Sequence, residues 1–287
     1  MKTSSCVLNK KMLPPLIFAL AIIIQSIHAQ VFTNGDFQWM YHTAGNGSSD
    51  GIQIVNYTGP DANVIIPDTI NDGHINQPVV AISSWNNTPA FSRSSVTQVT
   101  LGANVTYLGD GTFEYCDNLT SVTLGAKLST IGDSAFYDCP SLTTISIPAS
   151  VTNIVNYVFD WCTSLANIVV EANNTNYSSA GGVLFDKSKT ALFRYPLALK
   201  NGYLIPNSVT NISVHAFFGS QLSSVMMGSN VATIAPGAFA NCTRLTDIAV
   251  NSDNKNFESI YISSSQREGG SWLFDKSGTM LLQVRPA

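Results

Sequence analysis

A 23-residue period runs through the middle of the chain and constrains its fold more than any other feature. Three consecutive segments, which begin at Val96, Leu119 and Leu142, align without a gap. A unit of this length cannot bury its own apolar face, so self-similarity at a fixed period of about 20 to 50 residues is typical of a solenoid of stacked coils. The period therefore predicts architecture before any local structure is considered. It also predicts an extended surface for a partner.

Each unit contains the same short elements. Val122 and Leu124 alternate with polar residues, which favours a short strand whose apolar side chains point inward. A second short strand or turn follows at Leu128 and Ile131, and Ala135–Phe136 can occupy a single helical turn that begins at an Asp or Ser cap. Stacking at about 4.8 Å per coil predicts one buried column of phenylalanines and one of leucines. These columns are Phe113, Phe136 and Phe159, and Leu119, Leu142 and Leu165.

The N-terminus indicates export. Three lysines precede an apolar run from Leu13 to Ile24, and the small residue Ala29 follows a short polar stretch. This order is typical of a secretory signal peptide, and we assign it to residues 1–29. An uncleaved membrane anchor is the alternative, but the apolar run is short for a span of about 20 residues. The rest of the chain has no second long apolar stretch, which predicts a secreted or cell-surface protein without a membrane span.

Charge argues against a nucleic-acid partner. Residues 1–29 hold three of the 14 Lys and Arg residues, so the remaining chain has 11 basic and 18 acidic residues and a formal net charge of −7. A surface of this kind lacks the clustered positive charge that phosphate backbones and anionic lipids require. Only 11% of all residues are charged, against about 25% in an average globular chain.

The repeat resembles a known family. The segment LTSVTLGAKLSTIGDSAFYDCPSL from Leu119 and the segment LTTISIPASVTNI from Leu142 resemble BspA-like leucine-rich repeats. The resemblance continues at Asn207–Ile212 and Leu222–Arg244, so it covers most of the chain after the signal peptide. It implies a leucine-rich repeat solenoid that is α/β horseshoe-like and β-rich, with parallel strands joined by short turns or single helical turns.

The same reading divides the chain into segments. Residues 30–95 are predicted to form an N-terminal β cap and a divergent first repeat, and residues 96–287 the repeat solenoid. Two departures from the period, near 173–199 and 254–287, share an Asn-x-Asn-aromatic start and the letters LFDKS. Apolar runs on both sides of LFDKS predict β-hairpins that extend from the stack. The second hairpin is either a C-terminal cap or the point at which the polypeptide has been cut short.

In the leucine-rich reading, the third and fifth positions of each strand face a partner. We take as partner-binding candidates the residues Thr100, Thr123, Ser146, Val169, Met226 and Asp247. The hairpin aromatics Phe193 and Tyr195 complete a predicted apolar hot spot near Val169 and Met226. The alternative is that the two aromatic side chains pack the hairpin onto the stack.

No residue pattern indicates catalysis or a cofactor. The exposed stripe has one ionisable residue, Asp247, whereas acid–base or nucleophilic chemistry needs paired groups. The histidines His42, His74 and His215 lack metal-ligand spacing. We therefore predict a protein that is not an enzyme and binds neither a metal nor a cofactor.

Four cysteines lie at one position of the repeat: Cys116, Cys139, Cys162 and Cys242. In an exported chain, stacked neighbours about 5 Å apart could form a disulfide. The family pattern instead places a buried cysteine here, a small apolar filler of the coil. We expect free thiols and keep the bridge as the alternative.

Together these features predict a secreted or cell-surface protein that binds a protein or glycan without catalysis. The family resemblance implies a role in adhesion. Two alternatives are a targeting module of a larger secreted hydrolase and a structural spacer at the cell surface. The residues leave the ligand and the oligomeric state open.

Overall fold

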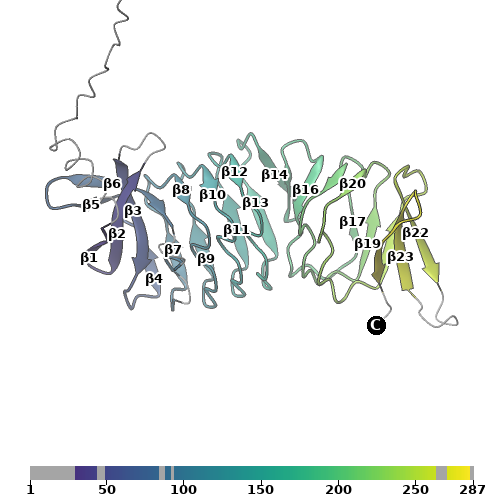
Figure 1. Ribbon diagram of the computed structural model, residues 1–287, viewed down its shortest axis with the longest axis horizontal. Coiled ribbons are helices and arrows are strands. Elements are labelled where there is room, and N and C mark those ends of the chain that lie inside the picture. The colour runs from purple at the N-terminus through teal and green to yellow at the C-terminus, as the bar shows by residue number, and fades with distance from the viewer. Residues whose placement is uncertain (1–29, 44–48, 84–87, 92–93, 263–269, 285–287) are drawn as a thin grey trace, which may run out of the picture.

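The protein is an elongated stack of coils, as the computed structural model shows (Figure 1). The structure describes residues 30–43, 49–83, 88–91, 94–262 and 270–284. The signal peptide predicted at 1–29 lies outside these residues. The predicted solenoid of parallel strands is confirmed. Within the described residues there is no helix, and therefore none that is long and apolar enough to cross a bilayer.

Each coil contributes a strand to each of two sides of the stack. We call the first side the primary sheet face. Its strands are β4 (Asn63–Ile65), β7 (Gln98–Thr100), β9 (Ser121–Thr123), β11 (Thr144–Ile147), β13 (Asn167–Val170), β17 (Tyr203–Leu204), β19 (Ser224–Met227) and β21 (Asp247–Val250). The other side has β6 (Asn76–Ile82), β8 (Tyr107–Leu108), β10 (Thr130–Ile131), β12 (Asn153–Ile154), β18 (Asn211–Ile212) and β20 (Thr233–Ile234). Parallel pairing joins equivalent residues, as in Thr100 with Thr123.

The segment around Phe136 is a turn, which corrects the single helical turn predicted there. Ser134 and Asp138 flank it with left-handed φ angles of 54° and 52°. These residues interrupt a helical run before it can close a regular ladder of hydrogen bonds. The Phe136 amide instead donates to the Val158 carbonyl of the next coil at 3.0 Å. The turns therefore bond coil to coil, as the strands do.

The predicted side-chain columns form the core. The rings of Phe113 and Phe136 stack with centroids 5.3 Å apart, and those of Phe136 and Phe159 are 5.8 Å apart. The leucine column, Leu119, Leu142 and Leu165, is fully buried. The repeat period produces these columns, because residues of the same type at the same position of the repeat contact each other in adjacent coils.

An antiparallel β unit covers the first coil. It consists of β1 (Phe32–Asn34), β2 (Phe37–Thr43) and β3 (Ser49–Tyr57), and β3 then pairs in parallel with β6. A short strand, β5 (Thr69–Asn71), pairs with the other end of β6. Ile52 and Ile54 of β3 are fully buried, which closes the end of the core.

Two three-stranded antiparallel units interrupt the coils. The first contains β14 (Tyr177–Ala180), β15 (Val183–Asp186) and β16 (Ala191–Arg194), and the second contains β22 (Phe257–Ile262), β23 (Gly270–Asp275) and β24 (Met280–Val284). The sequence predicted that the first hairpin extends from the stack, and this prediction is wrong. Phe185 and Leu192 are fully buried, and β16 pairs in parallel with β18 of the next coil. The hairpin is a layer of the stack because both of its faces carry apolar residues.

The shared Asn-x-Asn-aromatic motif explains how a coil gives way to a hairpin. The side-chain amide of buried Asn174 donates to the carbonyls of Pro148 and Val151 at 2.8 and 2.9 Å. Its oxygen accepts the amides of Asn176 and Tyr177. Asn254 makes the equivalent contacts in the second unit. A buried amide satisfied in this way anchors the new direction of the chain.

The core consists of two clusters that meet at the first hairpin. One cluster extends from Trp39 to Leu184, and the other from Val183 to Leu273. Among the described strands, β13 and β17 share no ladder, nor do β12 and β18. We call the place where the two clusters meet the junction. It is held by side chains and the hairpin rather than by a continuous sheet.

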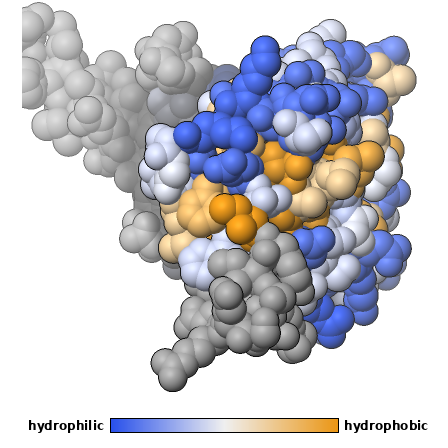
Figure 2. Space-filling model, turned by 90° about the vertical axis from the view of Figure 1, so that its right-hand side faces the viewer, coloured by the Kyte–Doolittle hydropathy of each residue, from blue (hydrophilic) through white to orange (hydrophobic). Residues whose placement is uncertain are grey.

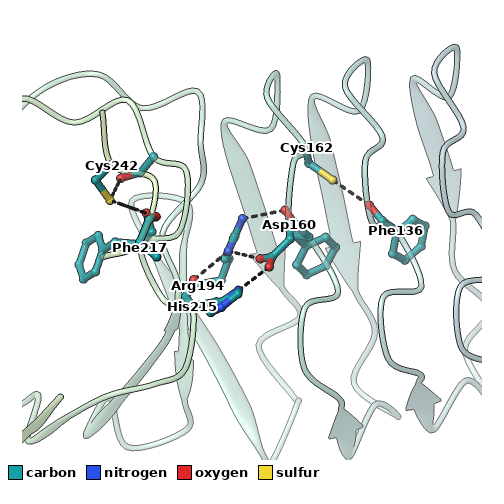
Figure 3. Close-up of polar contacts among 10 residues, drawn as sticks. Phe136, Asp160, Cys162, Arg194, His215, Phe217 and Cys242 are labelled. Carbon is teal, nitrogen blue, oxygen red and sulfur yellow. Dashed lines mark hydrogen bonds and ion pairs between the residues drawn. The ribbon is translucent and has the colours of Figure 1, made fainter. Parts of the chain in front are cut away.

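The four repeat cysteines are free, as predicted. Each thiol donates to the carbonyl of a phenylalanine in the preceding coil. Cys139 donates to Phe113 at 3.1 Å, and Cys162 donates to Phe136 at 3.0 Å, as Figure 3 shows. The neighbouring Cys162 thiol and burial both raise the pKa of Cys139 above its ordinary value. A protonated, enclosed thiol is a poor nucleophile.

Thiol titration of the chain from residue 30 is expected to give four free thiols after unfolding without a reductant. In the folded protein the same reagent should react slowly, because the thiols are protonated and largely enclosed. A reduced sample is the matched control and should give the same number. Fewer than four thiols in the non-reduced sample would instead indicate a bridge between stacked cysteines.

Candidate binding sites

The primary sheet face presents the predicted partner-binding residues of the strands in one row. By strand register, Thr100 lies beside Thr123, and Ser146 lies beside Val169. All four side chains are exposed, whereas the residues before them in their strands are buried. The alternation places them on the outer surface because successive strand side chains point to opposite sides. The row is polar along the first core cluster and becomes apolar at Val169.

The row also contains two residues that the sequence analysis missed. Ile65 lies beside Thr100 and is 75% exposed, and Leu204 lies beside Met226 and is 63% exposed. Met226 is itself 47% exposed. The signal was present in the sequence, because Leu204 and Ser146 occupy the same place in the segments YLIP and ISIP. Leu204 and Met226 therefore form an exposed apolar pair on adjacent strands.

The remaining candidates are not all on this surface. Asp247, the first residue of β21, is exposed, but its carboxylate accepts a 2.6 Å hydrogen bond from the Ser271 hydroxyl. Tyr195 is 2% exposed and packs against Tyr203 and Phe217. Its ring belongs to the core, which corrects its assignment to an exposed hot spot and favours the packing alternative. The Tyr195 amide donates to the Ala216 carbonyl of the next coil at 2.7 Å, which holds the ring beside Phe217.

Phe193 lies on the other side of the stack from Val169 and Met226. It belongs to β16, which joins β18 and β20, and it is 36% exposed. Its ring contacts Tyr177 edge-on at 5.7 Å. The structure therefore does not unite Phe193 with Met226 in one patch. The predicted hot spot divides into the Leu204–Met226 pair and a separate site at the junction.

A buried ionic network crosses the junction (Figure 3). The Asp160 carboxylate, 2% exposed, accepts bonds of 2.6 Å from the Arg194 guanidinium and from Nδ1 of His215. Arg194 also donates to the backbone carbonyls of Phe159 and His215, both at 2.8 Å. Asp160 and Phe159 belong to the last full coil of the first core cluster, and His215 lies between Ile212 and Ala216 of the second cluster. The network therefore ties the two halves of the stack together.

Burial dominates the electrostatics of this network. It lowers the pKa of Arg194 from its ordinary value, and the nearby Asp160 carboxylate counteracts the shift. The Nε of Arg194 is buried without a hydrogen-bond partner. Among the described residues, Asp160 is the one hydrogen-bond partner of the His215 ring, so no nucleophile is aligned with it. No group of three or more metal-binding side chains gathers in the described part of the chain.

A cavity of about 290 Å³ opens beside the network. Its walls come from the coil at residues 154–160, the hairpin residues Tyr177 and Phe193, and the coil at residues 211–215. Sequence reasoning missed this site, although its signal is visible. Asp160 and Arg194 are charged in a chain with few charges. The second unit has Ala240 at the position of Asp160, and its strand pairing places Leu282 at the position of Arg194, whereas the letters alone align Gln283 there.

The second unit builds a similar groove between residues 234–240 and the hairpin residues Leu273, Leu281 and Leu282. This groove is apolar and opens at the C-terminal end of the stack. Figure 2 shows hydrophobic residues gathered on that end, with hydrophilic ones above and beside them. Leu281 and Met280 are 45% and 50% exposed there. The two grooves share a backbone plan and differ in side-chain chemistry.

Comparison with known proteins places the repeats in a family. A family model described as the BspA type leucine rich repeat region matches residues 87–201 and 189–277, with six copies. A search of curated proteins finds no match.

Similar chains occur among solved structures, and the first of the three given below shows the same fold. The pneumococcal vaccine antigen PcpA is 19% identical, with a TM-score of 0.55, over 78% of this chain and 71% of that chain. A leucine rich cell surface protein from Faecalibacterium prausnitzii is 26% identical, with a TM-score of 0.46, over 76% of each chain. A leucine-rich repeat protein from Eubacterium ventriosum is 22% identical, with a TM-score of 0.47, over 77% of this chain and 72% of that chain. With its period, its buried columns and the family match over most of its length, the chain belongs to the BspA-type leucine-rich repeat family.

Proposed function

We propose that this is a secreted or cell-surface protein that binds a partner without catalysis, through the primary sheet face. The family and the cell-surface description of one similar structure support this role. The single observation that carries it is the Leu204–Met226 pair, two large apolar side chains that are exposed on adjacent strands. A rigid sheet binds at low entropic cost because its side chains are already ordered.

The chemistry of the face favours a protein partner over a glycan. Exposed leucine and methionine side chains gain most by burial against apolar groups, and such anchors surrounded by polar residues are typical of hot spots. Thr100, Thr123 and Ser146 supply a neutral polar rim along the rest of the row. A glycan that bound this face would contact mainly that hydroxyl row.

Replacing both Leu204 and Met226 with aspartate is expected to weaken partner binding at least about 30-fold, the equivalent of about 2 kcal/mol at a hot spot. The chain from residue 30 should first be screened against purified matrix proteins and glycans at two salt concentrations. An apolar contact predicts weak dependence on salt. Affinity is then measured by surface plasmon resonance.

The matched control is Ile75→Asp, which introduces the same charge at an apolar residue that is 59% exposed on the N-terminal cap. It should bind as the unmodified protein does, and both variants should keep their thermal stability because exposed sites tolerate substitution. Unchanged affinity of the double variant for a captured partner would exclude the pair from the interface. Absence of any saturable partner would favour the role of a spacer.

A further inference from the structure

The junction cavity differs from its counterpart in the second unit at the residues that line it. Asn156, Tyr157 and Asp160 correspond to Pro236, Gly237 and Ala240, 80 residues later. Leu184 pairs with Arg194 in the first hairpin, and the equivalent Leu273 pairs with Leu282 in the second. The second unit forms the same coil and hairpin without polar or aromatic residues at these places. The fold therefore does not require the polar and aromatic residues that line the junction cavity.

Backbone strain occurs at the same place, as it does at Tyr115 and Trp161 on the other side of their turns. Tyr157 has a left-handed φ of 59°, a conformation that L residues with bulky side chains avoid. The equivalent residues of other coils are small at Gly111, Ser134 and Gly237. The exceptions are Tyr157 and His215, which face each other across the junction with ring centroids 4.7 Å apart. Strain of about 1–3 kcal/mol per residue is typical of sites where function selects the side chain.

The lining offers aromatic surface and unused hydrogen-bonding groups. Tyr157 and Phe193 are 39% and 36% exposed. The Ser213 hydroxyl and the Asn156 side-chain amide make no hydrogen bond within the described residues. Asn211 accepts a bond from Thr233 on its oxygen, which leaves its NH₂ group as a donor. The cavity thus combines two partly exposed rings with three neutral polar side chains.

The ionic network beside the cavity disfavours charged ligands. The Asp160 charge is already balanced by Arg194, and its second oxygen is bonded to His215. A further full charge placed here would lose hydration without finding an unpaired counterion. A neutral ligand with many hydroxyl groups loses less hydration free energy, and its hydroxyls can both donate hydrogen bonds to the side chains of the cavity and accept them.

We propose that the junction cavity binds one ring of a neutral carbohydrate. The C–H face of the sugar would pack on Phe193 and Tyr157, and its hydroxyls would pair with Asn156, Asn211 and Ser213. Ligand pockets typically measure about 300–1,000 Å³, so a cavity of about 290 Å³ suits a single ring rather than a longer chain. This site lies apart from the primary sheet face, and it does not depend on the function proposed for that face.

The test uses glucose, galactose, mannose and N-acetylglucosamine as probes for the chain from residue 30. Saturation-transfer NMR and calorimetry should detect at least one of them, with a Kd in the millimolar range. Tyr157→Gly restores the residue used at positions 111 and 237, so it should fold normally and raise the Kd at least tenfold. Phe193→Ala should have an effect of similar size, and thermal melting checks that both variants are folded.

Two controls separate this site from the primary sheet face. The Leu204→Asp, Met226→Asp double variant should bind the sugar as the unmodified protein does. Tyr157→Gly should in turn keep any protein partner of that face. No binding of any neutral sugar, binding that is unchanged in both cavity variants, or a preference for glucuronate or glucosamine would each overturn the proposal.

Discussion

Replacing Phe136 with alanine is expected to lower the free energy of unfolding by about 3 to 5 kcal/mol. Phe136 is fully buried in the middle of the phenylalanine column, with a ring from each neighbouring coil stacked against it. Truncation would remove the buried apolar surface and leave a cavity that two adjacent coils cannot close, because their spacing is fixed by backbone hydrogen bonds. Urea unfolding followed by circular dichroism measures the change.

The control for this prediction is Thr123→Ala, at an exposed residue of the same coil. It should change the free energy of unfolding by no more than about 0.5 kcal/mol. If Phe136→Ala were as stable as the control, the phenylalanine column would not be the core of the stack. A smaller loss for Phe136→Leu than for Phe136→Ala would show that the filled volume is what matters.

Replacing Asp160 with alanine is expected to lower the free energy of unfolding by about 3 to 5 kcal/mol, because it leaves the Arg194 charge buried and unpaired. Both side chains are almost fully buried, at 2% and 6% exposure. The substitution also removes the bond from His215, which is one of the contacts that hold the second core cluster against the first. The loss should therefore be concentrated at the junction rather than spread along the stack.

The second unit supplies the matched rescue for this variant. It has Ala240 and Leu282 where the first has Asp160 and Arg194. The double variant Asp160→Ala, Arg194→Leu should regain most of the lost stability, since apolar replacement of a buried ion pair is often neutral or stabilising by about 1 to 4 kcal/mol. Both variants are compared by urea unfolding. A double variant less stable than Asp160→Ala alone would contradict this account.

Much of the fold could be predicted from the sequence because residues at the same position of the repeat contact each other in neighbouring coils. Once Phe113, Phe136 and Phe159 are aligned at one period, their stacking follows from the spacing between coils. The strands, the cap over the first coil and the free cysteines follow from the same alignment. The helical turn did not form because two left-handed residues, such as Ser134 and Asp138, flank each of the turns at Phe113, Phe136, Phe159, Phe217 and Phe239. Glycine gives the clearest sequence signal for that conformation, and these coils often have another residue in its place.

The junction could not be predicted, because it depends on contacts that the period does not describe. Asp160 and Arg194 are 34 residues apart, and their pairing is set by how the hairpin folds back onto the stack. Aromatic residues near a hairpin have no sequence feature that separates exposed Phe193 from buried Tyr195. Leu204 was missed because the alignment of its coil began at Asn207, after the strand. Residues that break a repeat need the structure to place them.

The division of the core into two clusters has a mechanical consequence. Within each cluster, neighbouring coils are joined by a backbone ladder on at least one side, whereas at the junction the described coils share none on either side and are held by a hairpin and a few side chains. A force applied along the stack should therefore separate the two halves before any coil unwinds, since local openings begin where backbone bonding is sparsest. On a surface exposed to flow, such a molecule would lengthen in one discrete step while each half stayed folded.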